Sequence, residues 1–348
     1  MKPRISNRAN MTLGRAILVC ACLLFLLLIV FLIASVLGSQ RLPLMSSLCA
    51  FTGKANCGLS AEQQAILFDL RWPRILLAGA VGTCLATAGA AYQALLRNPL
   101  AEPYLLGVSN GAAVGTMVAL VFMAAHEWTR PVMAFAGALA ATFVVYRLAR
   151  GRTGASPERL ILAGVIVTTF LSSAIVFITT LMDATRIRSF TFWLLGDLSG
   201  TTTNLLAIAF IAAAVGVAVL VFNARALNLM MLGERDAFDL GVEVGRVRLV
   251  VFIAASLLVG ASVASSGSVG YVGLVVPHLV RLSFGSDNRL VLPAAAIAGA
   301  IFVIVADTIA RTVIAPRELP VGAITALIGA PLFIYLLKRR VNSGSQAQ

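Results

Sequence analysis

Charged residues are scarce in this chain, and their scarcity limits its class. Only 12% of the 348 residues are Asp, Glu, Lys or Arg, whereas 59% are hydrophobic and the mean hydropathy is +0.95. Polar side chains are too few to cover the surface of a soluble domain of this length. The composition therefore excludes a soluble globule and indicates a polytopic membrane protein.

Catalytic signatures are absent as well. None of the three lysines, Lys2, Lys54 and Lys338, lies in the G-x-x-x-x-G-K-[ST] sequence of a P-loop. Both histidines are isolated, and neither H-E-x-x-H nor G-x-S-x-G occurs. We therefore expect no catalytic residue, no bound metal ion and no cofactor, and any ATP hydrolysis would take place in another chain. The same absences disfavour an intramembrane enzyme.

Cysteine is rare, and none of the five has the spacing of a metal site. Cys20, Cys22 and Cys84 lie inside apolar blocks, where a thiol behaves as a small hydrophobic group. Cys49 and Cys57 flank a short polar loop that we expect on the outer side of the membrane. Either a disulfide in an oxidising periplasm or two free thiols fits this pair.

Long apolar blocks make up most of the remaining sequence. A helix needs about 20 residues to cross about 30 Å of hydrocarbon, and about ten blocks qualify. They lack the period-two alternation of an outer-membrane barrel strand, so helices are the expected spanning element. A further segment, residues 191–200, is too short to span and predicts an interfacial helix. We expect an all-α polytopic membrane protein with about ten transmembrane helices.

The basic residues indicate how these helices are oriented. Net charge is +13, but Lys and Arg lie at the ends of apolar blocks rather than in an aromatic-interleaved patch, so no nucleic-acid partner is expected. With the N-terminus inside and ten helices, most of them fall on cytoplasmic segments, as the positive-inside rule requires. We expect a cytoplasmic N-terminus (1–15), one transmembrane domain (16–340) and a cytoplasmic tail (341–348).

The most charged internal segment, residues 226–243, lies between two long apolar blocks. It contains two Glu, two Asp and one Arg after position 233, yet half of it is apolar. Its apolar residues are spaced as two short amphipathic helices broken by Gly233 and Gly241. The pattern favours a docking surface, with an ordinary solvated loop as the alternative.

Three further features need a structural reason. Arg71 and Arg74 stand near the start of an apolar block, where a buried arginine costs about 2.5 to 3.5 kcal/mol, so they either snorkel or face protein or water. Asp307 and Arg311 are spaced to pair on one helix face. Residues 265–273 repeat glycine before a proline, which predicts broken backbone at membrane depth, covered by protein or a water-filled cavity.

With these residues in view, the chain resembles the permease subunits of bacterial type II ABC importers for iron-siderophores, haem and vitamin B12, the FecCD family. The resemblance covers about residues 15–340. It is carried by Arg71-Trp72-Pro73-Arg74, the run 97–111, Leu232-Gly233-Glu234, the run 270–278, the run 306–311 and Glu318-Leu319-Pro320-Val321-Gly322.

The resemblance implies a type II ABC importer permease fold of ten helices with inverted repeats. It also implies a homodimer in the bacterial inner membrane, two cytoplasmic ATP-binding subunits and a periplasmic substrate-binding protein. The residues that match the family's ATPase-coupling helices are Leu227, Leu232, Gly233, Glu234, Asp236 and Leu240. Those that match its arginines for docking the binding protein are Arg71, Arg74 and Arg311. Those that match its cytoplasmic gate are Ser156, Pro157 and Glu158. At the gate the chain departs from the small hydroxyl pair of vitamin B12 permeases.

The expected function is alternating-access import of a metal chelate, driven by ATP hydrolysis elsewhere. A ferric siderophore is the first candidate, with vitamin B12 and haem close behind. The alternative from another class is an ion-coupled secondary carrier, which would act without an ATPase and would require Asp307 as a mid-helix carboxylate.

Overall fold

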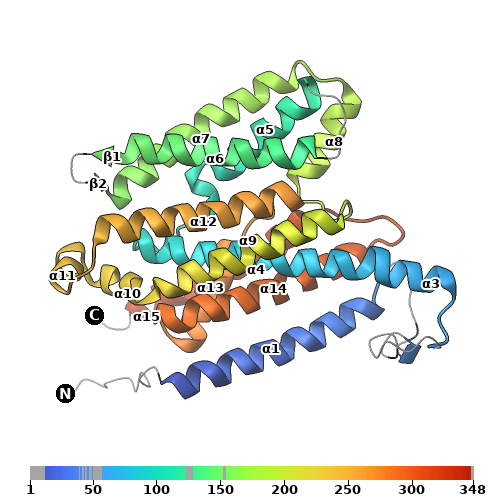
Figure 1. Ribbon diagram of the computed structural model, residues 1–348, viewed down its shortest axis with the longest axis horizontal. Helices are drawn as coiled ribbons and strands as arrows, with labels where there is room; N and C mark the ends of the chain where they lie inside the picture. Colours follow the sequence, from blue (N-terminus) through green and yellow to red (C-terminus); the bar gives the residue numbers. More distant parts are fainter. Residues whose placement is uncertain are drawn as a thin grey trace.

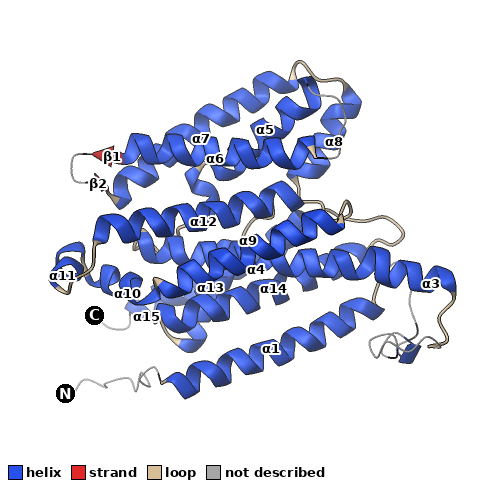
Figure 2. Ribbon diagram, viewed as in Figure 1, coloured by secondary structure: helices blue, strands red, loops and turns tan. Residues whose placement is uncertain are grey.

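The computed structural model describes residues 12–38, 40, 43, 45–46, 49, 57–122, 128–151 and 154–345. Within these ranges the regular structure is helical apart from one two-stranded ribbon, β1 (Arg150–Gly151) paired antiparallel with β2 (Gly154–Ala155) (Figure 2). The elements run nearly parallel to one long direction, with α7 at one edge of the bundle and α1 at the other (Figure 1).

Seven helical segments are long and apolar enough to cross a membrane. They are α1 (Leu13–Val36), the continuous run of α3 (Ala61–Ala65), the π-helix η1 (Ile66–Arg71) and α4 (Trp72–Leu95), α6 (Thr129–Ala149), α7 (Pro157–Thr179), α9 (Thr203–Phe222), α12 (Val244–Ser266) and α14 (Asn288–Thr312).

Three helices with a shorter apolar stretch complete the bundle: α5 (Val108–Phe122), α13 (Val272–Phe284) and α15 (Val321–Ser345), whose apolar stretch is Val321–Leu336. Short elements connect them: the 3-10 helix η2 (Pro103–Leu106), α8 (Ala184–Leu194), α10 (Ala224–Leu232) and α11 (Glu234–Asp239). In the described chain, the seven spans and three shorter helices make ten apolar helices, which confirms the predicted fold class.

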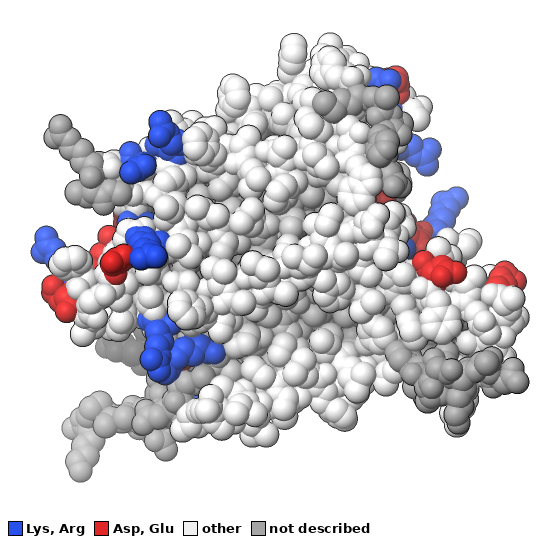
Figure 3. Space-filling view, in the orientation of Figure 1, with Lys and Arg blue, Asp and Glu red and all other residues white. Residues whose placement is uncertain are grey.

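Charged side chains lie at the two ends of the bundle. In Figure 3 the Lys, Arg, Asp and Glu side chains on this face gather at the two ends, and a broad uncharged belt lies between them. The end that carries α10 and α11 is also where α1 begins and α15 ends (Figure 1). This distribution suits a protein whose uncharged belt lies in hydrocarbon.

Helix α4 is the centre of the bundle, and small residues let its neighbours approach closely. A Cβ atom added at Gly82 would collide with the backbone of Gly299 in α14, and one added at Gly89 would collide with the backbone of Gly273 in α13. Such contacts are typical of helices that pack in a membrane. By contrast, the most apolar 18-residue window of α1 has no buried residue.

The predicted break after α12 is confirmed. Gly267 and Tyr271 have positive φ values of 68° and 66° on either side of the non-helical link to α13. Protein groups satisfy its backbone: Tyr104 Oη donates to Val269 O and accepts from Val269 N, both at 3.0 Å, and Glu102 Oε1 accepts from Tyr271 N at 3.1 Å. The irregular backbone is therefore covered by protein, as membrane depth requires.

The predicted interfacial helix was wrong in its position. Helix α8 occupies 184–194, and residues 195–202 are not helical. Asp183 starts α8 early because its side chain accepts a hydrogen bond from Arg186 N, and Gly196 ends the helical path with φ of 86°. The prediction followed the apolar and aromatic content of residues 191–200 and did not take these two local signals into account.

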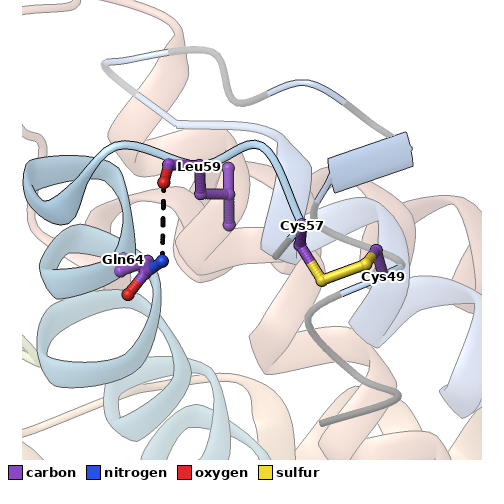
Figure 4. Close-up of a disulfide and its surroundings, with 4 residues drawn as sticks. All are labelled: Cys49, Cys57, Leu59 and Gln64. Atoms are coloured by element: carbon purple, nitrogen blue, oxygen red, sulfur yellow. Dashed lines mark hydrogen bonds between the residues drawn. A yellow bond between two sulfur atoms is a disulfide. The ribbon is translucent and has the colours of Figure 1, made fainter. Parts of the chain in front are cut away.

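Of the two alternatives for the outer loop, the structure has the disulfide. Cys49 and Cys57 are joined, with an S–S distance of 2.05 Å (Figure 4). Just beyond the bridge, Gln64 Nε2 donates to Leu59 O at 3.4 Å, and Ser60 with Gln63 forms a capping box that starts α3. The disulfide thus lies just before the start of the continuous helical run of α3, η1 and α4.

Candidate functional site

The charged segment 226–243 forms the two short helices that the sequence predicts. Helix α10 ends at Leu232, α11 begins at Glu234, and Gly241 follows α11 with φ of 84°. Leu227 in α10 is fully buried, whereas Leu232 and Leu240 are 69% and 62% exposed. One face of the pair therefore holds the segment to the bundle, and the other presents apolar side chains at the charged end.

Glu234 ties α11 to the ends of two central helices. Its Oε1 atom lies 2.5 Å from Arg248 Nη2 in α12 and 3.4 Å from Arg97 Nη2, just beyond α4. Arg248 is buried, whereas Glu234 and Arg97 are partly open to solvent. A carboxylate at the first position of α11 also suits the positive end of that helix. Glu234 thus joins α11 to α12 and to the chain that follows α4.

Arg248 reaches a second segment as well. Its Nη1 atom donates to the carbonyl oxygen of Ala155, in β2. Ala155 precedes Ser156, the first of the expected gate residues. A single buried guanidinium therefore links Glu234 of the expected coupling segment with the chain that enters α7.

The three expected gate residues begin α7. Ser156 is the N-cap, and its Oγ accepts from Arg159 N at 3.4 Å. Pro157 follows at the first helical position, where its missing N–H costs nothing, and Glu158 lies in the first turn beside the positive helix end. The departure from a hydroxyl pair thus produces a strong helix start.

At the opposite end, Arg71 is buried and its donors are taken by backbone carbonyls. Nη1 donates to Ser35 O at 2.9 Å and to Val36 O at 3.2 Å, and Nη2 donates to Gln40 O at 2.8 Å. These carbonyls are at and beyond the last turn of α1, which has no partner for them in its own helix. In this conformation Arg71 caps α1.

Arg74 and Arg311 meet at Asp307. Asp307 Oδ1 lies 2.9 Å from Arg74 Nε, and Oδ2 lies 2.9 Å from Arg311 Nε. The Asp307 side chain is 1% exposed, and the pairing of Asp307 with Arg311 expected from their spacing is confirmed. Arg74 Nη1 also lies 2.6 Å from Oε2 of Glu318, whose side chain is 41% exposed. We call these four residues the Asp307 cluster.

Sequence reasoning missed three of these participants: Arg97, Arg248 and Glu318. Arg97 and Glu318 lie in the family motifs, but nothing in their local pattern gave them a partner. Arg248 stands in an ordinary basic helix start, and Ala155 is 93 residues away along the chain. Only the tertiary fold brings them together.

Among the described residues, no group of three or more His, Cys, Asp and Glu side chains could hold a metal ion. His278 is buried, with its ring 6.2 Å from that of Phe333. His278 lies within α13 itself.

Comparison with known proteins gives one consistent result. The model of the FecCD transport family matches residues 26–339. A cobalamin import system permease protein, BtuC of Halobacterium salinarum, is 40% identical over 302 residues, which cover 87% of this chain and 81% of that protein. A hemin transport system permease protein, HmuU of Yersinia pestis, is 37% identical over 318 residues, which cover 90% of this chain and 94% of that protein.

Among solved structures, an inward-facing conformation of a metal-chelate type ABC transporter superposes with a TM-score of 0.82 at 30% identity. The match covers 92% of this chain and 99% of that chain. The likeness thus extends over nearly the whole bundle described above.

Proposed function

The chain belongs to the FecCD transport family, and from that premise we propose that it is the permease subunit of an ATP-driven importer that carries a metal chelate inward. The observation that carries the mechanism is the exposed surface of α10 and α11, joined through Glu234 and Arg248 to the start of α7. A permease needs such a link because its ATPase is a separate chain.

In this proposal the cytoplasmic ATP-binding subunits seat on the exposed side chains of Leu232, Phe238 and Leu240. Closure of those subunits displaces α11. Because Glu234 pairs with Arg248, and Arg248 holds the Ala155 carbonyl, the displacement reaches Ser156, Pro157 and Glu158. Opening and closing of the gate at these three residues would switch the bundle between two packed arrangements, as alternating access requires.

A periplasmic binding protein would dock at the other end, over the Asp307 cluster. Glu318 is the most exposed member, and its pair with Arg74 lies at the rim. A carboxylate of the binding protein can therefore displace Glu318 and take Arg74 first. Arg71 and Arg311 are buried in this conformation, so their contact with a partner requires Arg71 to leave the end of α1 and the Asp307 cluster to open.

The same proposal sets the arrangement in the cell. Both termini are cytoplasmic, the chain lies in the bacterial inner membrane, and two copies form the pathway along their two-fold axis. Helix α7 offers exposed apolar side chains for a partner or lipid, among them Leu162, Ile166 and Phe170.

An ion-coupled carrier has no comparable support. Its candidate carboxylate, Asp307, is engaged by two arginines. A coupling site would need that carboxylate to exchange a proton or a sodium ion.

The test is uptake by cells that carry this permease with its own ATPase and binding protein. Labelled ferric siderophores, cobalamin and haem are offered in parallel, because the relatives above are named for cobalamin and hemin. We expect uptake of one chelate, a ferric siderophore first, and its loss when the ATPase is inactivated in its Walker A lysine. Uptake that persists with the inactive ATPase would overturn the proposed mechanism.

A further inference from the structure

An apolar groove lies between α6, α9 and α12. Its volume is about 470 Å³, within the usual range of about 300 to 1,000 Å³ for small-molecule sites. Its lining includes small residues: Ala212, Gly216 and Ala261. It also includes bulky apolar residues: Val132, Phe135, Ile208, Ile211, Val215 and Leu257.

The groove has the length and position of a lipid chain. All three helices that form it are candidate membrane spans. Along α9 it runs from Leu205 to Val219, about 21 Å at about 1.5 Å per residue. One leaflet is about half of a 30 Å hydrocarbon core, so the groove is long enough to hold the part of an acyl chain that crosses one leaflet.

A polar cavity of about 170 Å³ continues the groove at one end. The two share Trp128, Pro131, Leu205, Ala264 and Ser265 in their linings. Trp193 also lines the polar cavity. Tryptophan is enriched where hydrocarbon meets the headgroup layer, so this end lies at headgroup level.

The polar cavity offers one charge of each sign. Arg130 and Asp197 both line it, and both are exposed. Arg130 forms no ion pair with an acidic residue in the described part of the chain. Asp197 Oδ1 accepts from Ser199 N at 2.8 Å and from Ser199 Oγ at 2.6 Å, and no hydrogen bond from a described residue reaches its Oδ2.

We propose that this site binds one aminophospholipid of the phosphatidylethanolamine type. One acyl chain lies in the groove, the phosphate pairs with Arg130, and the ammonium group pairs with Asp197. A lipid with an anionic glycerol headgroup satisfies Arg130 but brings no cation to Asp197. The site therefore prefers the zwitterionic lipid.

The experiment measures lipid that stays bound to the full chain. The protein is purified in mild detergent, equilibrated with equal amounts of phosphatidylethanolamine and phosphatidylglycerol, washed, and analysed by native mass spectrometry. We expect about one retained phosphatidylethanolamine per chain. Ala212→Trp, which fills the groove, should lower this retention at least fivefold. The matched control is Ala21→Trp, the same change on the exposed face of α1, which should not lower it.

Two surface variants test the headgroup assignment without filling the groove. Asp197→Asn should lower retention of phosphatidylethanolamine alone and bring the ratio of the two lipids toward one, whereas Arg130→Gln should lower retention of both. Equal retention of the two lipids by the unaltered chain overturns the proposal. So does unchanged retention in Ala212→Trp, including the case in which that variant instead loses self-association, because the groove would then be an interface between copies.

Discussion

Replacing Asp307 with Asn should be among the most destabilising changes of similar size in this protein. The substitution keeps the shape of the side chain and removes its charge. Arg74 and Arg311 would then keep two guanidinium charges with only Glu318, 41% exposed, to balance them. Removing one partner of a buried ion pair costs about 3 to 5 kcal/mol, because the remaining charge stays buried without compensation.

The prediction is measured as a difference in the free energy of unfolding, by titrating the detergent-solubilised protein with denaturing detergent. The control is Glu243→Gln, which breaks a pair with Arg246 whose side chains are 74% and 79% exposed. That surface pair should contribute about 0 to 1 kcal/mol. If Asp307→Asn loses no more stability than Glu243→Gln, the cluster is not held together by its charges and our account of it is wrong.

Three more outcomes follow from the packing and the charges. Arg248→Ala should reduce uptake at least about tenfold in the assembled importer while ATP hydrolysis continues, because a lost charge-assisted hydrogen bond is worth about 1.5 to 3 kcal/mol. Equal losses of uptake and hydrolysis would count against a linking role for Arg248. Gly89→Ala should destabilise the bundle by about 1 to 3 kcal/mol in the same unfolding titration, because the added Cβ meets backbone of α13, whereas Gly14→Ala, with open space around it, should not destabilise it. Hydrogen bonds from Arg289, above all, lower the pKa of Asp287 to about 2. The stabilisation of the fold by the ionised Asp287 carboxylate is therefore complete above about pH 4 and is lost as the pH falls toward 2. A profile of stability against pH in that window that is unchanged by Asp287→Asn would contradict this.

The sequence was sufficient to predict the features that depend on residues close together in the chain. Hydrophobic run length predicts the spans, and the break at Gly233 predicts α10 and α11, because a helix depends on residues within a few positions of one another. The pair Asp307 and Arg311 is local in the same sense. The interfacial helix was misplaced because composition dominated over two short-range signals, the cap at Asp183 and the positive φ of Gly196.

Contacts between distant segments could not be predicted in this way. Arg74 meets Glu318 across 244 positions, and Arg248 meets Ala155 across 93. A single sequence contains no local pattern for such pairs, since their geometry depends on how every helix between them packs. The roles proposed for the coupling, docking and gate residues therefore rest on the resemblance and on these contacts together, and the variants above test them.

Helix α4 connects the two ion-pair clusters, and this connection bears on how the proposed cycle works. Arg74 lies in its first turn and reaches Asp307, whereas Arg97 follows its last turn and reaches Glu234. Between them, glycine contacts with α14 and α13 leave no room for a methyl group. A core packed this tightly resists small deformations and shifts as a unit. In the proposed cycle, a displacement of α11 would reach the Asp307 cluster through α4 itself, so a change at Gly89, between the two ends of α4, should disturb both ends.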